Sequence, residues 1–262
     1  MTRLRLGATV LGAIFLVACA SAPSAPSSHG RDGVDRVSPV RAAEVNTRLG
    51  VGYMERGQLQ LAMEKLDTAL RHDPEHTPAH LTLAVIYERL GNTRQAGQHF
   101  RQASRLAPTD GAIQNAYAVF LCRQGEFAEA ERHFERAFED PFYATPEVAF
   151  SNAGACARRS GDLAAAEAYL REAIRLDPGF PDGLFQMAEL SMLQGEAFRA
   201  RAFLQRYESV AQPHAGALVL GYQIESALGN SGEAERYATY LETGFPDSPQ
   251  ARELRSQRHA DD

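Results

Sequence analysis

The chain repeats itself every 34 residues over much of its length. Tyr53 recurs as Tyr87, and Pro74 recurs as Pro108. A fixed period of this length is typical of stacked supersecondary units, because one such unit cannot bury its own apolar face without neighbours. The period therefore predicts a repeat architecture in place of a fold with one central core.

Small residues, large apolar residues and prolines stand at set offsets inside each repeat. The second half of each unit carries the residues Ala62, Leu66 and Ala69; Ala96, Phe100 and Ala103; Ala130, Phe134 and Ala137; Ala166, Leu170 and Ala173; Ala200, Leu204 and Tyr207; and Ala234, Ala238 and Leu241. Small residues let two helices approach closely, large ones fill the groove between them, and a proline ends the second helix. Each unit is therefore predicted to be a pair of helices.

Two steps along the chain depart from the period. An extra loop with the sequence PFYATPE, starting at Pro141, lengthens the step from the third repeat to the fourth to 36 residues. In the sixth repeat we expect one inserted residue near Gly229. After Pro246, Ser248 as N-cap and Pro249 at the first helical position predict a short terminal helix.

This combination of period and pattern is that of the tetratricopeptide repeat. We therefore predict an all-α tetratricopeptide solenoid, with about six helix-turn-helix repeats in a right-handed superhelix over residues 43–247. Residues 248–262 are expected to form a capping helix and tail.

The first residues of the chain resemble a bacterial lipoprotein signal peptide. Arg3 and Arg5 precede an apolar run that is too short to span a bilayer and ends in the sequence LVAC, with Cys19 last. We expect residues 1–18 to be the signal peptide, Cys19 to be the lipidated N-terminus, and residues 19–42, rich in Ala, Ser, Pro and Gly, to be a flexible tether. The alternative is an ordinary secretory signal in which the cysteine is coincidental.

Charge and motif content favour a binding protein over an enzyme. Without Arg3 and Arg5 the net charge changes from −6 to −8, which argues against nucleic acid as the main ligand. No phosphate loop or nucleophile motif is present. We predict no enzyme activity, no cofactor and no small-molecule substrate.

Three histidines spaced by four residues raise the question of a metal site. They are His72, His76 and His80, and Pro74 and Pro78 interrupt any helix that would align them. We therefore predict no metal site and expect these histidines in loops and on the surface.

The first helix of each repeat is expected to line the concave face of the solenoid. The candidate partner-binding residues there are Thr47, Val51, Met54, Leu81, Val85, Glu88, Asn115 and Val119, and charges such as Arg89 and Arg123 would set the register of a partner. A mostly apolar lining fits an amphipathic helix or a strand segment. The alternative is that several of these side chains pack against neighbouring repeats.

Cys122 and Cys156 are the two thiols that remain once Cys19 is acylated. They stand on the first helices of the third and fourth repeats, where they can face each other, and export to an oxidising compartment permits a bridge. The alternative is two small buried apolar side chains on adjacent helices, since disulfide geometry is demanding. Both interpretations stay open at this point.

Longer segments carry a narrower resemblance. Residues 115–162, with FLCRQG, DPFYATPE and NAGACARRSGD, and residues 245–251, FPDSPQA, resemble the type IV pilus biogenesis lipoproteins of the PilF/PilW type. The resemblance implies a pilotin: a lipid-anchored, periplasm-facing outer-membrane protein that promotes localisation and multimerisation of the pilus secretin. The alternative is a periplasmic adaptor lipoprotein that regulates peptidoglycan enzymes or proteases, or that assists outer-membrane protein assembly.

Overall fold

The computed structural model describes residues 38–260. The predicted signal peptide, the lipidation site Cys19 and most of the predicted tether lie outside the described residues. Every statement about the structure below concerns residues 38–260.

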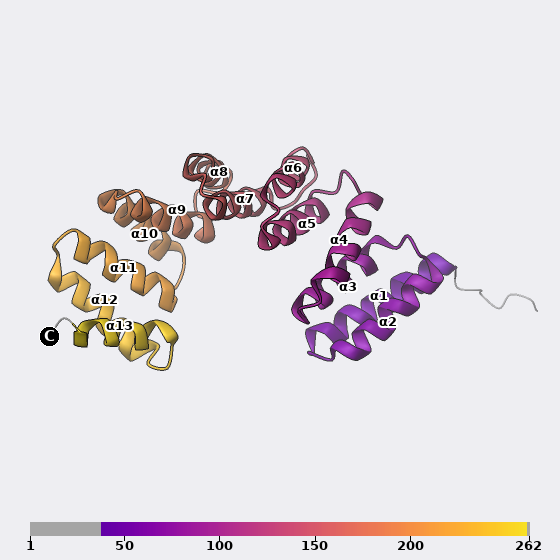
Figure 1. Ribbon diagram of the computed structural model, residues 1–262, viewed down its shortest axis with the longest axis horizontal. Coiled ribbons are helices and arrows are strands. Elements are labelled where there is room, and N and C mark those ends of the chain that lie inside the picture. The colour runs from indigo at the N-terminus through magenta and orange to yellow at the C-terminus, as the bar shows by residue number, and fades with distance from the viewer. Residues whose placement is uncertain (1–37, 261–262) are drawn as a thin grey trace, which may run out of the picture. The chain divides into compact units, whose positions relative to one another are not determined.

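The described chain consists of thirteen α-helices joined by short connections (Figure 1). The helices are α1 (Pro39–Glu55), α2 (Leu59–His72), α3 (Thr77–Arg89), α4 (Thr93–Leu106), α5 (Gly111–Gln124), α6 (Phe127–Phe138), α7 (Pro146–Ser160), α8 (Leu163–Leu176), α9 (Pro181–Leu193), α10 (Ala197–Val210), α11 (Ala215–Ala227), α12 (Ser231–Gly244) and α13 (Pro249–Ala260). They form six helix-turn-helix repeats followed by a final helix, so the predicted all-α tetratricopeptide solenoid is confirmed.

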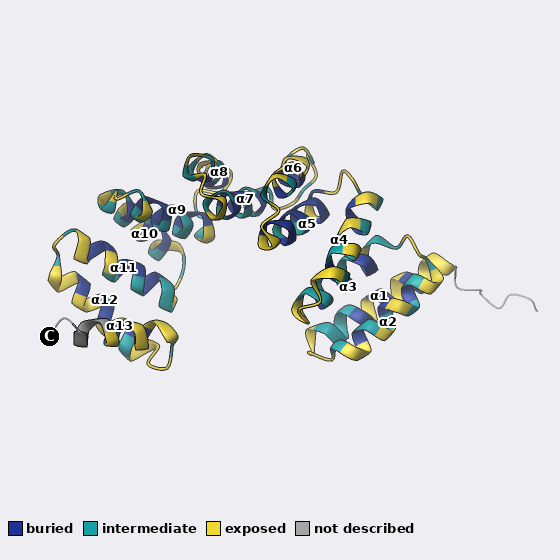
Figure 2. Cartoon of the chain, in the orientation of Figure 1, coloured by how far each residue is buried: buried dark blue, intermediate teal, exposed yellow. Residues whose placement is uncertain are grey.

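The small and large residues of the repeat pattern form the interior of each helix pair. Ala62, Leu66 and Ala69 of α2 are fully buried, and Figure 2 shows buried residues on the facing sides of the helices. A Cβ added to Gly50 of α1 would lie only 2.7 Å from Cγ of Leu66. The close approach of the two helices therefore requires a residue without a larger side chain at this position.

Each repeat turns between its two helices at a glycine with positive φ. These glycines are Gly57, Gly91, Gly125, Gly161, Gly195 and Gly229, with φ between +72° and +90°. This left-handed conformation ends the first helix, because glycine adopts it without the steric cost that a Cβ brings. The glycines follow one another at 34 residues, except for the step of 36 that the extra loop produces.

The first helix begins earlier than the sequence predicts. α1 starts at Pro39, so residues 39–42, part of the predicted tether, are helical. The Ser38 side chain accepts a hydrogen bond from the Arg41 backbone N–H, and Pro39 occupies the first turn. A serine cap followed by proline is a strong start signal that the high Ala, Ser and Pro content of the segment obscured.

The extra loop between α6 and α7 packs against the start of α5. Asp140 accepts a hydrogen bond of 2.8 Å from the backbone N–H of Gly111, and the hydroxyl of Tyr143 accepts one of 3.1 Å from the Asn115 side chain. The Tyr143 side chain lies so close to Gly111 that an added Cβ would be 2.9 Å from it. The insertion thereby caps α5 and supplies a negative charge at its N-terminus.

The expectation of one inserted residue near Gly229 in the sixth repeat is wrong. Helices α9 and α11 have equal length and start 34 residues apart, as do Gly195 and Gly229. The irregularity is one of side-chain size: Tyr222 stands where the preceding repeat has a small alanine, and Ala238 stands where it has a leucine. A large residue on α11 and a small residue on α12 have thus exchanged places. In the sequence this exchange looks like a shift of the repeat pattern by one residue.

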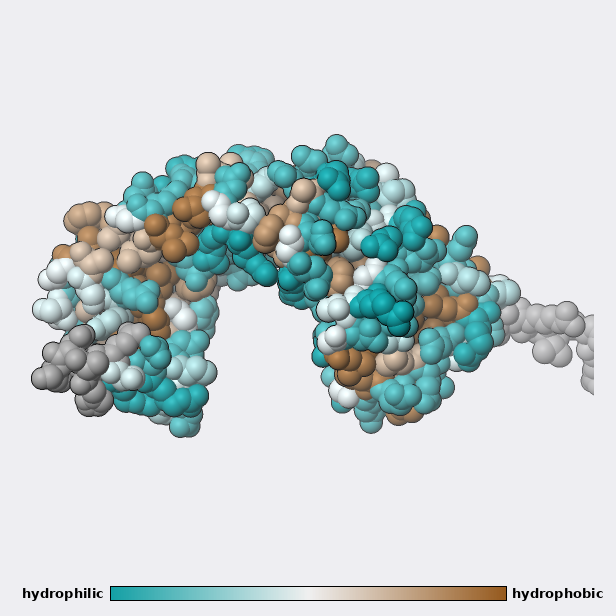
Figure 3. Space-filling view, viewed as in Figure 1, coloured by the Kyte–Doolittle hydropathy of each residue, from teal (hydrophilic) through white to brown (hydrophobic). Residues whose placement is uncertain are grey.

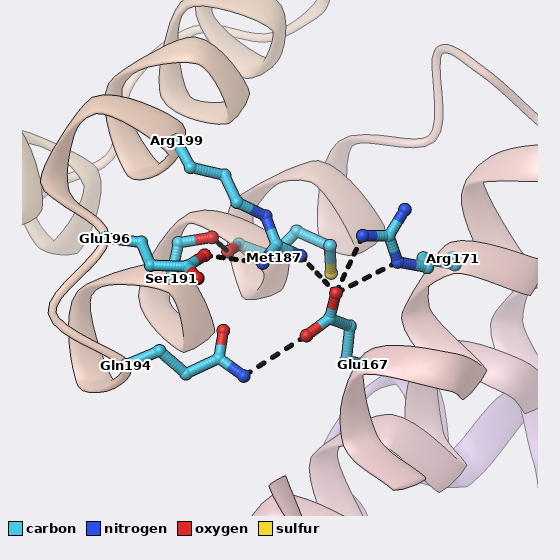
Figure 4. A network of polar contacts seen from close by, with 7 residues as sticks. All are labelled: Glu167, Arg171, Met187, Ser191, Gln194, Glu196 and Arg199. Atoms are coloured by element: carbon cyan, nitrogen blue, oxygen red, sulfur yellow. Dashed lines mark hydrogen bonds and ion pairs between the residues drawn. The ribbon is translucent and has the colours of Figure 1, made fainter. Parts of the chain in front are cut away.

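Repeats four and five are joined by a network of polar contacts (Figure 4). The Glu167 carboxylate on α8 accepts hydrogen bonds from Arg171, Gln194 and Arg199, and the Arg199 bond is 2.6 Å long. Arg199 also pairs with Glu196 at 2.6 Å. The bonds from Arg171 and Arg199 lower the pKa of Glu167 to about 2, so this carboxylate is charged under all ordinary conditions.

The surface seen in Figure 3 is mostly hydrophilic, with apolar patches such as the one over α9 and α11. None of the helices in the described part of the chain is long and apolar enough to span a membrane.

Candidate functional site

The first helices of consecutive repeats do not all pack together equally closely. α1 packs against α3, and α5, α7, α9 and α11 follow one another in contact, whereas α3 and α5 lack comparable close packing in the described chain. A groove with a volume of about 480 Å³ lies between α3 and α5. A groove of this kind between two repeats can accept a side chain of another protein.

The groove has an apolar base and charged edges. Its lining residues are Val85, Glu88 and Arg89 of α3, Phe100 of α4, and Ala116, Val119 and Arg123 of α5. Phe100 is only 2% exposed, and Val85 and Val119 are half-buried against the same core. The apolar base is thus held by the interior of repeats two and three.

One ion pair crosses the groove. Nη1 of Arg123 on α5 lies 3.0 Å from Oε1 of Glu88 on α3, and the Arg123 side chain is 56% exposed. Because an exposed pair of this kind contributes little to stability, both groups can exchange partners at small cost. An apolar base with exchangeable charges at the edge fits an amphipathic peptide segment, whose apolar side chains enter and whose charges set its register.

The structure brings part of the predicted binding set together at this groove. Val85, Glu88 and Val119 line it, and Leu81 packs beside them against the same core. The charges Arg89 and Arg123 also stand at its edge.

Four other candidate residues do not line the groove. Thr47 is only 6% exposed, Val51 is half-buried on α1, and Met54 packs against the core between α1 and α3. The Asn115 amide group donates to Tyr143 and accepts from Asn152, each at 3.1 Å. Thr47 and Asn115 thus serve packing between elements, in line with the alternative that the sequence left open.

Sequence reasoning did not assign Phe100 and Ala116 to the groove. Phe100 belongs to a second helix, and its role in the repeat pattern as a core residue concealed that its ring also forms the base of the groove. Ala116 precedes Tyr117 by one position and carries no charge or bulk that marks it. The sequence signal that does point to the groove is the valine that recurs at an interval of 34 as Val51, Val85 and Val119, two of which line it.

A disulfide joins Cys122 of α5 to Cys156 of α7, with their Cα atoms 5.8 Å apart. The two cysteines are 5% and 6% exposed, so the bond lies in the interior between repeats three and four. Cys122 directly precedes Arg123, and the bridge therefore restrains one wall of the groove against the next repeat.

The expectation that His80 is a loop or surface residue is wrong. It lies in α3, is 9% exposed, and its Nε2 is 2.9 Å from the carbonyl oxygen of Pro74 while its Nδ1 is 3.0 Å from Nδ1 of His99. The carbonyl requires Nε2 of His80 to carry the proton, so Nδ1 accepts from His99. Helix α3 begins at Thr77 with Pro78 in its first turn, where proline does not break a helix, and His80 therefore turns inward. No group of three metal-binding side chains is found in residues 38–260.

Comparison with known proteins agrees with this architecture. Profiles of the tetratricopeptide repeat match residues 53–98 and 157–219, and residues 81–144 and 116–181. The chain is 26% identical over 217 residues to the type IV pilus assembly protein PilF of Pseudomonas aeruginosa, covering 83% of this chain and 86% of that protein.

Two solved structures extend the comparison. The crystal structure of PilW, a widely conserved type IV pilus biogenesis factor, superimposes with a TM-score of 0.75 at 35% identity, covering 81% of this chain and 97% of PilW. The structure of Pseudomonas aeruginosa PilF gives a TM-score of 0.73 at 26% identity, covering 84% of this chain and 99% of the other. The chain therefore belongs to the family of tetratricopeptide-repeat proteins of type IV pilus biogenesis that includes PilF and PilW.

Proposed function

We propose that this protein is a lipid-anchored outer-membrane scaffold that faces the periplasm and promotes localisation and multimerisation of the pilus secretin. In this proposal a secretin segment binds in the groove between α3 and α5. The observation that carries it is the combination of the apolar base around Phe100 with the exposed Glu88–Arg123 pair. Such a role requires binding alone, with no catalytic group, cofactor or nucleic acid.

Two further observations support the proposal. The similarity to PilF and PilW covers most of this chain and nearly all of PilW, and both proteins are described by their role in type IV pilus assembly or biogenesis. The sequence LVAC at Cys19 is the anchor signal, although it lies outside the described residues.

The groove is tested by reversing one charge at its edge. Cells that lack the protein are complemented with Arg123→Glu, and secretin multimers that resist SDS are measured by immunoblot. We expect several-fold fewer multimers, because Arg123→Glu places two carboxylates together and repels the partner's acidic group. The double variant Arg123→Glu with Glu88→Arg restores opposite charges and should recover part of the loss.

Arg175→Glu is the matched control, because Arg175 is also exposed and ion-paired but lies on α8, outside the groove. It should leave multimers at the wild-type level. Normal multimers with folded Arg123→Glu would show that the secretin does not use this groove. If deletion of the whole protein also left the secretin multimeric, the adaptor role toward peptidoglycan enzymes, proteases or outer-membrane protein assembly would be favoured instead.

The anchor is tested separately with Cys19→Ala. Acyl chains contribute about 0.8 kcal/mol per buried methylene to membrane attachment. We therefore expect a folded protein that is not labelled by palmitate and leaves the membrane fraction. Persistence of the variant in outer-membrane fractions would contradict lipidation at Cys19.

A further inference from the structure

A second pocket, of about 460 Å³, lies at the other end of the solenoid between α10, α11 and α12. Its lining includes three carboxylates, Glu208, Glu225 and Glu233, two arginines, Arg201 and Arg236, and two tyrosines, Tyr237 and Tyr240. Tyr240 is 69% exposed, which is unusual for so large an aromatic side chain. The pocket thus combines aromatic walls with a high density of charge.

Glu208 of α10 is a half-buried carboxylate in this pocket with few hydrogen-bond donors. The hydroxyl of Tyr237 donates to its Oε1 at 2.8 Å. Burial raises the pKa of Glu208, the Tyr237 bond partly offsets that rise, and the negative charge of Glu225 adds to it. A carboxylate can accept about four hydrogen bonds, so the group has unused acceptor capacity.

The positive charges of the pocket are already paired with other carboxylates. Arg201 of α10 lies 3.3 Å from the buried Glu225 of α11, and Arg236 of α12 lies 2.8 Å from Glu233 on the same helix. Within the described chain, neither arginine forms an ion pair with Glu208. Three carboxylates and two guanidinium groups line the pocket, which leaves one negative charge uncompensated.

These charges are also particular to this end of the solenoid. Counting back by the repeat step, the position of Glu208 is occupied by Ile174, Phe138, Ser104 and Leu70 in the four earlier repeats, and the sixth repeat also carries a glutamate there, Glu242. The position of Glu225 is occupied by Ser191, Ala157, Leu121, Tyr87 and Tyr53. A carboxylate that replaces apolar or small residues at an inward position is costly, and such departures from a local rule mark functional sites.

We propose that the pocket between α10 and α12 binds an arginine side chain of a protein partner. The guanidinium group donates hydrogen bonds to the Glu208 carboxylate and stacks on the exposed ring of Tyr240. Arginine fits better than lysine, because a planar guanidinium donates in its plane while its face rests on an aromatic ring. This contact is independent of the groove between α3 and α5 and of the secretin proposal.

The probe is the peptide acetyl-Gly-Arg-Gly-amide, and its binding is followed by ¹H–¹⁵N NMR of the full chain at pH 7. A matched peptide carries citrulline, which has the same shape without the charge. We expect saturable shifts of the amide signals of Glu208, Tyr237 and Tyr240 with the arginine peptide, and binding at least tenfold weaker with the citrulline peptide.

Two variants test the assigned groups. Glu208→Gln should weaken binding of the arginine peptide at least tenfold. Tyr240→Ala should weaken it at least threefold, and because Tyr240 is exposed this substitution should not disturb folding. Glu126→Gln, an exposed carboxylate at the start of α6, is the control and should leave binding unchanged. The proposal is overturned if the three amide signals do not shift saturably, if citrulline binds equally well, or if both pocket variants retain wild-type binding.

Discussion

Two regions of the solenoid have the same arrangement of helices but are held together by different polar groups. The first region is repeats two and three, and the second is repeats four and five. In the first region, Gln114 is fully buried and its amide contacts the carbonyl oxygens of Ser104 and Ala107 at 3.1 and 3.0 Å, while His133 contacts its Oε1 at 2.7 Å. In the second region, the partly exposed Glu167 accepts from arginines (Figure 4).

The difference shows which part of the repeat pattern is constrained. The alanine, leucine and phenylalanine positions are the same in both regions because they set the distance between helices. Polar contacts between repeats are free to vary, so one region uses neutral buried groups and the other uses charges. Neutral buried networks and ion pairs differ in how much stability the loss of a partner removes and in the pH range over which their contribution is lost, which makes the comparison testable.

The largest effect is expected at the boundary between the two regions, where the disulfide Cys122–Cys156 closes a loop with a sequence separation of 34. Replacing both cysteines by alanine should lower the free energy of unfolding by about 3 to 4 kcal/mol, because the unfolded chain regains the entropy of that loop. Urea denaturation of the oxidised wild type and the double variant measures this. Equal unfolding midpoints would mean that packing alone holds repeats three and four together.

The next largest effect is expected inside the first region, for Gln114→Leu. The substitution removes the donor to two buried carbonyl groups and the acceptor for His133, and unsatisfied buried groups cost about 1 to 3 kcal/mol each. We expect a loss of at least about 2 kcal/mol in urea denaturation. A loss below about 0.5 kcal/mol would contradict the claim that this network stabilises the region.

A third effect separates the two regions by pH. Burial, followed by the electrostatic effect of the neighbouring His80, lowers the pKa of His99, and burial, followed by Arg136, lowers the pKa of His133. The unfolded chain then binds more protons than the native one below the ordinary histidine pKa of about 6.5, so stability should fall as pH drops from 7 to 5. Hydrogen exchange, corrected for intrinsic rates, should show protection lost in α3–α6 before α8–α10.

His99→Asn is the control for this pH effect, because its amide keeps a donor near His80 but does not titrate in this range. It should reduce the pH dependence in α3–α6. Equal loss of protection in both regions between pH 7 and 5 would show that the buried histidines do not control it.

The smallest effect is expected in the second region, for Glu167→Gln. Although the pKa of Glu167 is lowered to about 2, its ion pairs are partly exposed, and pairs of this kind contribute about 0 to 1 kcal/mol. A lowered carboxylate pKa stabilises the fold above its ordinary value and loses that contribution as pH falls from about 4.5 toward 2. We expect Glu167→Gln to cost under about 1 kcal/mol at pH 7, and the difference from the wild type to vanish near pH 2.

Much of the fold could be predicted from the sequence because the relevant contacts are local. The small-large-small pattern of Ala62, Leu66 and Ala69 recurs in the first four repeats, and each helix pair is built from neighbouring residues, so periodicity predicted the six repeats. The helix after Pro246 followed from the cap at Ser248 and the proline after it. Ser248 does accept from the Ala251 backbone N–H, as a cap should. Two of the groove residues followed from the same register, since Val85 and Val119 stand one period apart.

The remaining features depend on contacts between repeats, which no local pattern contains. Burial of His80 results from its pairing with His99, 19 residues away on another helix. The expected insertion in the sixth repeat was wrong because a large residue, Tyr222, and a small one, Ala238, have exchanged places between the two helices of the repeat, and residue size alone cannot distinguish such an exchange from an insertion. The start of α1 was missed because composition outweighed the cap at Ser38.

The sequence by itself determined the class of fold, the number of repeats and the positions of their buried residues, because a 34-residue period is a statement about spacing along the chain. Only the tertiary structure decided where neighbouring helices leave a cavity, at the groove between α3 and α5 and the pocket around Glu208, and where they lie close enough for the disulfide between α5 and α7. These sites arise from distances between helices, and such distances depend on how side chains of neighbouring repeats fill the space between them.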